Sequence, residues 1–252
     1  MKTLCLDMGL GISGDMFSAA CYSYMDGDLR CDYLVRAGAG CEEFGGSIAM
    51  EEVSVPPLSG HAMHVTFADG ITPPRSIDEA AWVIGALVRR LGLSEPGKAF
   101  TTDVLRDIIG AEAAAHGVTA DHVHLHEIGR MAGLYNIASA GLCYDILGLD
   151  ECEIIGSPVS LGGGRIRTEH GLLDVPTPAA AYLSAKLKTR PGPHEGEMAT
   201  PTGIAIAKNL LRRQVEPLPE PGRQGIGFGS KSFKGVLGSL RLFECTASTG
   251  GR

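Results

Sequence analysis

The densest group of side chains that could do chemistry is a run of alternating histidines that ends in a glutamate. His122, His124 and His126 stand two residues apart, and Glu127 follows the last of them. In an extended strand, side chains two residues apart point to the same face, so the three imidazoles would share one side. Neutral imidazole binds nickel, zinc, copper or iron. The run therefore predicts a metal site.

Two further candidate ligands lie upstream, in a segment with helical periodicity. Glu112 and His116 are four residues apart, which places them on the same face of a helix. A helix pair beside a strand pair can supply four ligands to one ion, so we expect His116, His124, His126 and Glu127 to line one site. The alternative interpretation is a set of exposed or hydrogen-bonded histidines near the end of a helix.

A glycine-rich turn near the N-terminus is a second candidate site. Residues 9–15 read Gly-Leu-Gly-Ile-Ser-Gly-Asp, between a short apolar stretch and an apolar segment that we expect to be helical with Asp15 as its N-cap. A strand–turn–helix unit can hold a phosphate on its backbone N–H groups. The turn lacks the Walker lysine, and an ordinary tight turn fits equally well. Asp7 ends the strand, where ligand sites in α/β sheets gather.

Two later glycine or threonine segments could also contact an anion. Gly162-Gly163-Gly164-Arg165 and Glu169-His170-Gly171 lie on consecutive turns, and Arg165 or Arg167 could hold a phosphate or carboxylate. A solvated hairpin is the alternative. Thr200-Pro-Thr-Gly203 precedes a helical stretch and offers hydroxyl caps and N–H groups, although an ordinary N-cap has the same pattern.

Composition limits the classes of function. The 252 residues are 44% apolar, which is enough for a folded core, and 22 basic against 29 acidic residues give a net charge of −7. An acidic chain without a basic run is a poor candidate for binding nucleic acid or an anionic membrane. We expect a cytoplasmic protein, because no signal peptide or membrane span stands out. The seven scattered cysteines predict reduced thiols, most of them buried.

Alternating patterns at both ends of the chain predict an α/β or α+β fold, with a mixed sheet and flanking helices in a single compact unit. This unit would span residues 1–245, with a small helical subdivision around 70–148 and a flexible tail at 246–252. The expected strands cover residues 2–6, 46–55, 60–68, 151–157 and 236–245, and the expected helices cover 16–25, 77–91, 99–116, 135–147, 179–187 and 204–212.

Taken together, these motifs resemble the nickel-insertion protein family, LarC, over about residues 3–245. The matching segments occur in family order: Asp7 with Gly11-Ile-Ser-Gly14-Asp15-Met16, Glu112-Ala-Ala-Ala-His116-Gly117, His124-Leu-His126-Glu127-Ile-Gly129, Gly156-Ser-Pro158, Leu161-Gly162, Gly164, His170-Gly171, Val175-Pro176, Pro178, Thr200-Pro-Thr-Gly203 and Gly225-Ile-Gly227-Phe-Gly229.

The resemblance implies an activity and its cofactors. Members of this family insert nickel into pyridinium-3,5-bis-thiocarboxylic acid mononucleotide, and the product is the nickel-pincer cofactor of lactate racemase-type enzymes. It implies a nickel chelatase of the lyase class that uses CTP with Mg²⁺ or Mn²⁺. Longer members carry a C-terminal domain linked to CTP use, so the resemblance also implies a separate C-terminal nucleotide-binding chain as a partner.

The resemblance and the motifs together assign roles to individual residues. As catalytic residues we expect Asp7, Asp15 and Glu127, with the two aspartates holding Mg²⁺ or Mn²⁺ beside a nucleotide triphosphate. The expected metal ligands are Glu112, His116, His124, His126 and His170. The expected contacts to the mononucleotide are Gly11, Ser13, Gly14, Gly162, Gly164, Arg165, Thr200 and Thr202.

The chain departs from the family at three positions. Ala132 and Asn136 stand where the family has aspartates, and Pro74 before Arg75 replaces a histidine. These changes keep a second hypothesis open, namely a nickel-binding or regulatory paralogue that has lost turnover. A metal-dependent hydrolase is a weaker alternative, because it would need the missing carboxylates.

Overall fold

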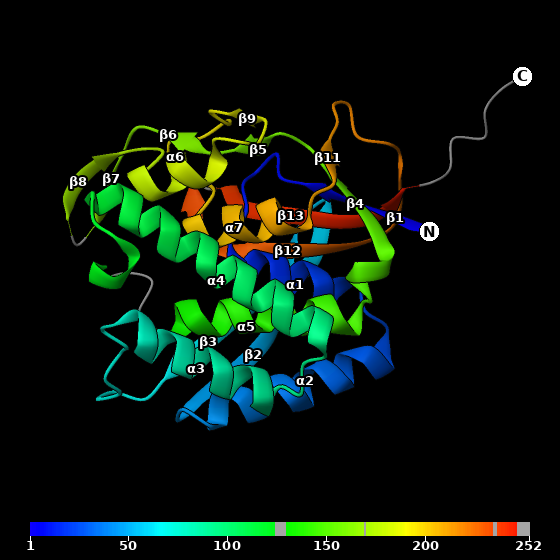
Figure 1. Cartoon of the computed structure of the whole chain (residues 1–252). Coiled ribbons are helices and arrows are strands. Elements are labelled where there is room, and N and C mark those ends of the chain that lie inside the picture. Colours follow the sequence, from blue (N-terminus) through cyan, green and yellow to red (C-terminus); the bar gives the residue numbers. More distant parts are fainter. Residues whose placement is uncertain (124–129, 169, 234–235, 246–252) are drawn as a thin grey trace, which may run out of the picture.

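The computed structural model describes residues 1–123, 130–168, 170–233 and 236–245 (Figure 1). Its α-helices are α1 (Gly14–Tyr24), α2 (Gly27–Glu42), α3 (Ile77–Arg90), α4 (Glu95–His116), α5 (Met131–Ile146), α6 (Pro178–Ser184) and α7 (Pro201–Leu210). The longer strands are β1 (Lys2–Asp7), β2 (Gly46–Val55), β3 (Leu58–Phe67), β4 (Cys152–Gly156), β7 (Arg165–Thr168), β8 (Gly171–Asp174), β12 (Pro221–Phe233) and β13 (Val236–Cys245). Two-residue strands are β5 (Val159–Ser160), β6 (Gly162–Gly163), β9 (Thr189–Arg190), β10 (Gly196–Glu197) and β11 (Arg213–Gln214).

Seven of these strands form one mixed sheet in the order β11-β4-β1-β13-β12-β3-β2. The first strand lies in the middle, parallel to β4 on one side and antiparallel to β13 on the other. The hairpins β2–β3 and β12–β13 extend the sheet, and β12 runs parallel to β3. The predicted mixed sheet with flanking helices is therefore confirmed.

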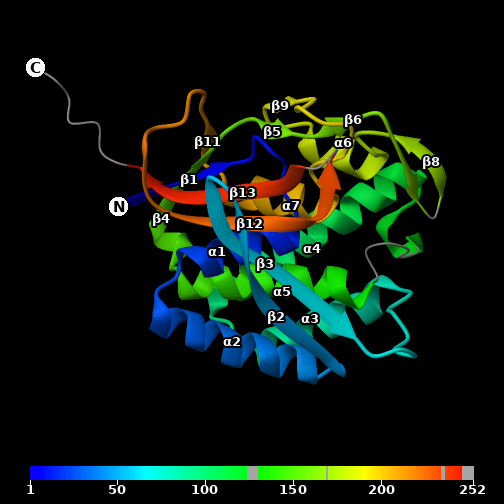
Figure 2. The same ribbon diagram turned by 180° about the vertical axis from the view of Figure 1, so that it is seen from behind.

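The main helices cover one face of this sheet, and Figure 2 shows the other face without a helix in front of it. Helix α1 packs directly on β12, and α5 packs against α1 from the other side. Gly225 and Gly227 on β12 allow this close approach, because a Cβ atom would lie 2.2 Å and 2.0 Å from the carbonyl oxygens of Ala20 and Met16. The glycine pattern at 225–229 thus serves helix–sheet packing.

Most predicted elements are present within a few residues of their expected bounds, and the differences have local causes. The N-cap of α1 is Ser13, whose hydroxyl accepts from the Met16 amide, so the expected Asp15 cap is wrong. Helix α2 was not expected, because its apolar residues do not follow a clear helical period and its sequence contains three glycines. His122 ends a short 3₁₀ helix, η1 (Ala120–His122), so the expected strand does not include it.

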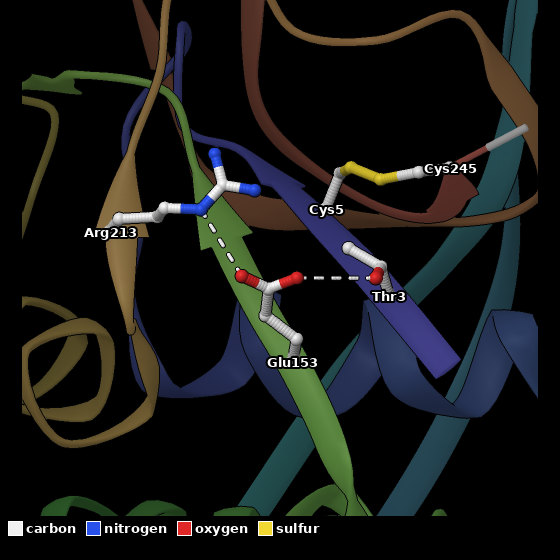
Figure 3. Close-up of a disulfide and its surroundings, with 5 residues drawn as sticks. All are labelled: Thr3, Cys5, Glu153, Arg213 and Cys245. Carbon is white, nitrogen blue, oxygen red and sulfur yellow. Dashed lines mark hydrogen bonds and ion pairs between the residues drawn. A yellow bond between two sulfur atoms is a disulfide. The ribbon is translucent and has the colours of Figure 1, made fainter. Parts of the chain in front are cut away.

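A disulfide joins Cys5 on β1 to Cys245 at the end of β13 (Figure 3). Cys5 lies opposite Phe243 in the β1–β13 register, so Cys245 is its diagonal neighbour. The prediction that all seven thiols are reduced is therefore wrong for these two. Sequence spacing could not reveal the pair, because 240 positions separate them. The other five cysteines are free, and all of them except Cys31 are buried, as expected.

Two side-chain bonds next to the disulfide join β1, β4 and β11. The Glu153 carboxylate accepts from the Thr3 hydroxyl at 3.3 Å and from Arg213 Nε at 3.1 Å (Figure 3). In the described part of the chain, no helix is both long and apolar enough to cross a membrane. The predicted tail, residues 246–252, lies outside the described residues.

Candidate metal centre

A cavity of about 260 Å³ opens where four elements meet: the end of α4, the β7–β8 hairpin, and the first turns of α6 and α7. Three of the predicted metal ligands line it. Its lining residues are Glu112, Ala115, His116, Thr168, His170, Leu173, Thr177, Pro178, Ala179 and Pro201.

Helix α4 positions the first two ligands. Ser94 caps its start and Gly117, with a φ of 65°, ends it, so the helix is regular through its last turn. Glu112 and His116 therefore lie on one face, and His116 Nε2 is 3.5 Å from Glu112 Oε2. The carboxylate is the more buried of the two, with 16% of its side chain exposed. A partly buried carboxylate beside an imidazole suits a divalent cation.

The β7–β8 hairpin brings the third ligand from a distant part of the sequence. His170 lies in its turn, where its amide donates to Thr168 Oγ1 at 3.1 Å. The His116 and His170 rings lie edge to face, with centroids 5.0 Å apart. At the open end of the hairpin, Arg165 Nε bonds Asp174 Oδ1 at 2.7 Å. Both side chains of this pair are exposed. Arg165 therefore fits the alternative of a solvated hairpin.

The described part of the site does not form a complete metal cage. Within residues 1–123, 130–168, 170–233 and 236–245, no three His, Cys, Asp or Glu side chains are arranged to hold a metal ion. His124, His126 and Glu127 lie outside the described residues, so their expected place in the site stays a prediction. In the described part of the chain, two histidines and one glutamate line this cavity.

Asp7 occupies the predicted position at the end of β1, and protein donors use both of its oxygens. Its Oδ1 accepts from the Gly9 amide at 3.0 Å, and its Oδ2 accepts from Arg241 Nε at 3.1 Å. Asp7 thus fastens the glycine turn to strand β13. A metal ion at Asp7 would have to displace the Arg241 ion pair.

The glycine turn also uses its own backbone donors. The Gly11 amide donates to the Met8 carbonyl and the Ile12 amide to the Met198 carbonyl, at 3.0 Å and 3.1 Å. Gly11 has a φ of 92°, and a Cβ atom there would lie 1.9 Å from the Met198 oxygen. A phosphate at this turn would therefore have to use other amides, such as those of Ser13 and Gly14 at the start of α1.

The first turn of α7 connects the glycine turn at residues 9–15 with the cavity. Thr200 Oγ1 caps the helix by accepting from the Gly203 amide at 3.2 Å, and the Thr200 amide donates to the Ile12 carbonyl. Pro201 lines the cavity, and the Thr202 methyl lies 3.1 Å from where a Cβ atom of Gly14 would stand. The two predicted sites are thus neighbours.

The other glycine segment is part of a short ladder. Gly162 pairs with Glu197 in β6–β10, and a Cβ atom at Gly162 would lie 1.8 Å from the Gly196 carbonyl oxygen. Gly164 follows with a φ of 73°. These glycines allow two backbone segments to approach each other. Whether they also contact a mononucleotide is not tested by this geometry, so that contact stays a prediction.

Nearly the whole chain matches one known protein family. Residues 4–251 match the profile of the family described as "Nickel insertion protein". The chain belongs to the nickel insertion protein family.

Curated relatives agree with this assignment. A protein of Geotalea uraniireducens, named as a nickel insertion protein, is 33% identical over 245 residues, which cover 96% of this chain and 60% of the relative. The pyridinium-3,5-bisthiocarboxylic acid mononucleotide nickel insertion protein of Desulfitobacterium hafniense is 30% identical over 91% of this chain and 54% of its own length. The chain thus spans little more than half the length of these relatives. No solved structure matches it.

In this nickel insertion family member, Ala132 and Asn136, where the family resemblance predicts aspartates, lie on α5. Asn136 contacts the start of α1: its Cβ is 2.9 Å from where a Cβ of Gly14 would stand. Asn136 Oδ1 is buried and has no hydrogen-bond partner among the described residues. Ala132, one turn earlier, is half-buried. Asn136 therefore faces the glycine-turn side of the site.

Sequence reasoning missed most of the apolar lining of the cavity. Ala115 lies inside the Glu112–His116 motif, and Pro178 is one of the positions that match the family. Leu173 and Thr177 belong to no motif in the sequence that indicates a site. Their contribution depends on the packing of the hairpin and α6 against α4, which no local spacing encodes.

Proposed function

We propose that this chain binds Ni²⁺ at the cavity and inserts it into pyridinium-3,5-bisthiocarboxylic acid mononucleotide. One observation carries the proposal: α4 and the β7–β8 hairpin bring Glu112, His116 and His170 to a single cavity. Two imidazoles and one carboxylate suit a borderline divalent metal such as nickel better than they suit Mg²⁺ or Ca²⁺.

The direction of transfer follows from donor chemistry. Imidazole and carboxylate hold Ni²⁺ through nitrogen and oxygen, whereas the thiocarboxylates of the mononucleotide offer softer sulfur donors. A metal held by few protein ligands can exchange them one at a time for sulfur. The open side of the cavity gives the second ligand set access, and the family relationship supports this reaction.

The proposal includes the ligands that lie outside the described residues. His124, His126 and Glu127 would complete the coordination from the segment before α5. Gly11, Ser13, Gly14, Thr200 and Thr202 would hold the phosphate end of the mononucleotide, with Gly162, Gly164 and Arg165 as further candidates. Support comes from the contact of α7 with both the cavity and the glycine turn.

CTP, a hard divalent ion and a partner chain that supplies a nucleotide-binding domain remain proposals from the family resemblance. The described residues do not fit a hard-metal site well. Asp7 is engaged by Arg241, and Ala132 and Asn136 lack carboxylates. Asp15 accepts a hydrogen bond from Ser13 at the start of α1. We therefore assign no step of the reaction to Mg²⁺, Mn²⁺ or CTP.

Calorimetric titration with Ni²⁺ tests the metal site. We expect the double variant His116→Ala/His170→Ala to bind nickel at least tenfold more weakly than the wild type. His64→Ala is the matched control, because His64 on β3 is an exposed imidazole that pairs with Glu51 of β2. Equal nickel affinity in the wild type and the double variant would remove the proposed site.

A second candidate function is a nickel-binding paralogue without turnover, which the loss of acidic groups at Ala132 and Asn136 favours. Incubation with nickel, the mononucleotide, CTP and Mg²⁺ separates the two. A chelatase produces growing absorbance of the nickel-pincer product, and the His116→Ala/His170→Ala variant does not. Nickel binding with unchanged absorbance would support the paralogue.

A further inference from the structure

The cavity that holds the candidate nickel ligands also has an apolar wall. Ala115 comes from α4, Leu173 from β8, Pro178 and Ala179 from α6, and Pro201 from α7. Four separate elements thus contribute aliphatic carbon beside two imidazole edges. A metal site alone does not need such a wall.

We propose that this wall is the binding surface for the flat pyridinium ring of the mononucleotide. The inference rests on the proposed function and adds the part of the substrate that enters the cavity. Size permits it, because an apolar cavity of about 150 Å³ is enough to hold benzene, and this cavity measures about 260 Å³. Flat rings also pack well against the edges of imidazoles and against proline.

The charges around the cavity favour the ring over the phosphate. Among the described residues that line it there is no Lys or Arg, and the only carboxylate is that of Glu112, most of whose side chain is buried. A pyridinium ring carries a positive charge that this carboxylate attracts. A phosphate in the same place would find no Lys or Arg to pair with among the described lining residues. The ring therefore lies inside and the phosphate outside.

This orientation places the reacting groups together. His116 and His170 line the same cavity as the apolar wall, so nickel held by them lies next to the ring. The thiocarboxylates are attached directly to that ring, and their sulfurs would come within reach of the metal. The apolar wall thus positions the substrate, whereas the histidines hold the metal.

A matched pair of small probes tests the ring site without sulfur or phosphate. We expect 1-methylnicotinamide, a pyridinium cation, to bind the wild type, as measured by ligand-observed NMR. Ala115→Leu should weaken this binding at least tenfold because the added carbons fill the cavity. Ala114→Leu is the control, since Ala114 is an exposed neighbour on α4 that does not line the cavity. Leucine suits a helix at both positions.

Charge is tested with nicotinamide, the neutral counterpart of the probe. The wild type should bind the cation several-fold more tightly than nicotinamide, and Glu112→Gln should remove this preference. A wild type that binds neither probe would overturn the inference. So would equal probe binding by Ala115→Leu and Ala114→Leu.

Nickel titration keeps this inference separate from the proposed function. Nickel affinity and the affinity for each probe are measured separately on the wild type. If the wild type binds nickel but neither probe, the ring site fails and the nickel site stands. If it binds the pyridinium probe but no nickel, the proposed function fails instead.

Discussion

Breaking the Cys5–Cys245 disulfide should strongly reduce the stability of the fold. The bond closes a loop across 240 positions, nearly the whole chain. In the chain-entropy treatment, a loop of about 240 residues lowers the entropy of the unfolded state by about 18 cal/mol/K, or about 5.5 kcal/mol at 25 °C. This value lies slightly above the range of measured disulfide effects, which reaches about 5 kcal/mol.

Urea unfolding, followed by circular dichroism, measures the effect. With a slope of about 3 kcal/mol/M for a chain of this size, the unfolding midpoint should fall by about 2 M when the bond is lost. The Cys5→Ala/Cys245→Ala variant and the reduced wild type should agree within about 1 kcal/mol, which is the cost of two small cavities.

Cys31→Ala is the control, because Cys31 is the exposed free cysteine among those described. Without reductant, the unfolding midpoint of this variant should equal that of the oxidised wild type. With reductant, it should equal that of the reduced wild type. An oxidised wild type whose midpoint does not change on reduction would refute the reasoning, as would a peptide map in which residues 5 and 245 are not linked.

Three further predictions concern packing, pH and metal preference. Gly227→Ala should lower the free energy of unfolding by about 3 kcal/mol, because its Cβ would meet an α1 carbonyl oxygen at 2.0 Å; urea unfolding checks this. Burial, with a smaller contribution from Arg30, lowers the pKa of His61, so the unfolded chain takes up the proton first as pH falls. The contribution of neutral His61 to the free energy of unfolding is therefore complete above about pH 6.5 and is lost as the pH falls below it. His61→Phe should flatten the pH–stability curve below about pH 6.5. The double substitution Ala132→Asp/Asn136→Asp should raise Mn²⁺ affinity and leave Ni²⁺ affinity nearly unchanged in parallel titrations; no gain for Mn²⁺ would mean that these positions do not face a metal.

Local periodicity was enough to predict the parts of the site that lie within one element. Glu112 and His116 share a face because a helix repeats every 3.6 residues, and the spacing alone contains that information. His170 comes to the same cavity only because the β7–β8 hairpin packs beside α4, and no spacing between residues 116 and 170 predicts this. The same limit explains the missed disulfide between strands that are far apart in sequence.

Composition misled where glycine or polar residues serve packing. Strand β12 has a glycine at every second position from Gly225 to Gly229, which is typical of a loop, yet these glycines admit α1 against the sheet. Helix α2 exposes much of its surface and therefore has little apolar periodicity. In both cases the element is determined by its neighbours in the fold rather than by its own sequence.

The central position of β1 has a consequence for synthesis. This strand precedes the other strands of the sheet in chain order, yet one of its two neighbours is β13, whose residues 241–244 pair with residues 4–7. On a ribosome, that side of β1 stays without its partner until almost the entire domain has been translated. Its apolar residues Leu4 and Leu6 would meanwhile offer an open strand edge to other chains. Completion of the sheet is therefore a late, long-range step, and fragments that stop before β13 should aggregate rather than fold.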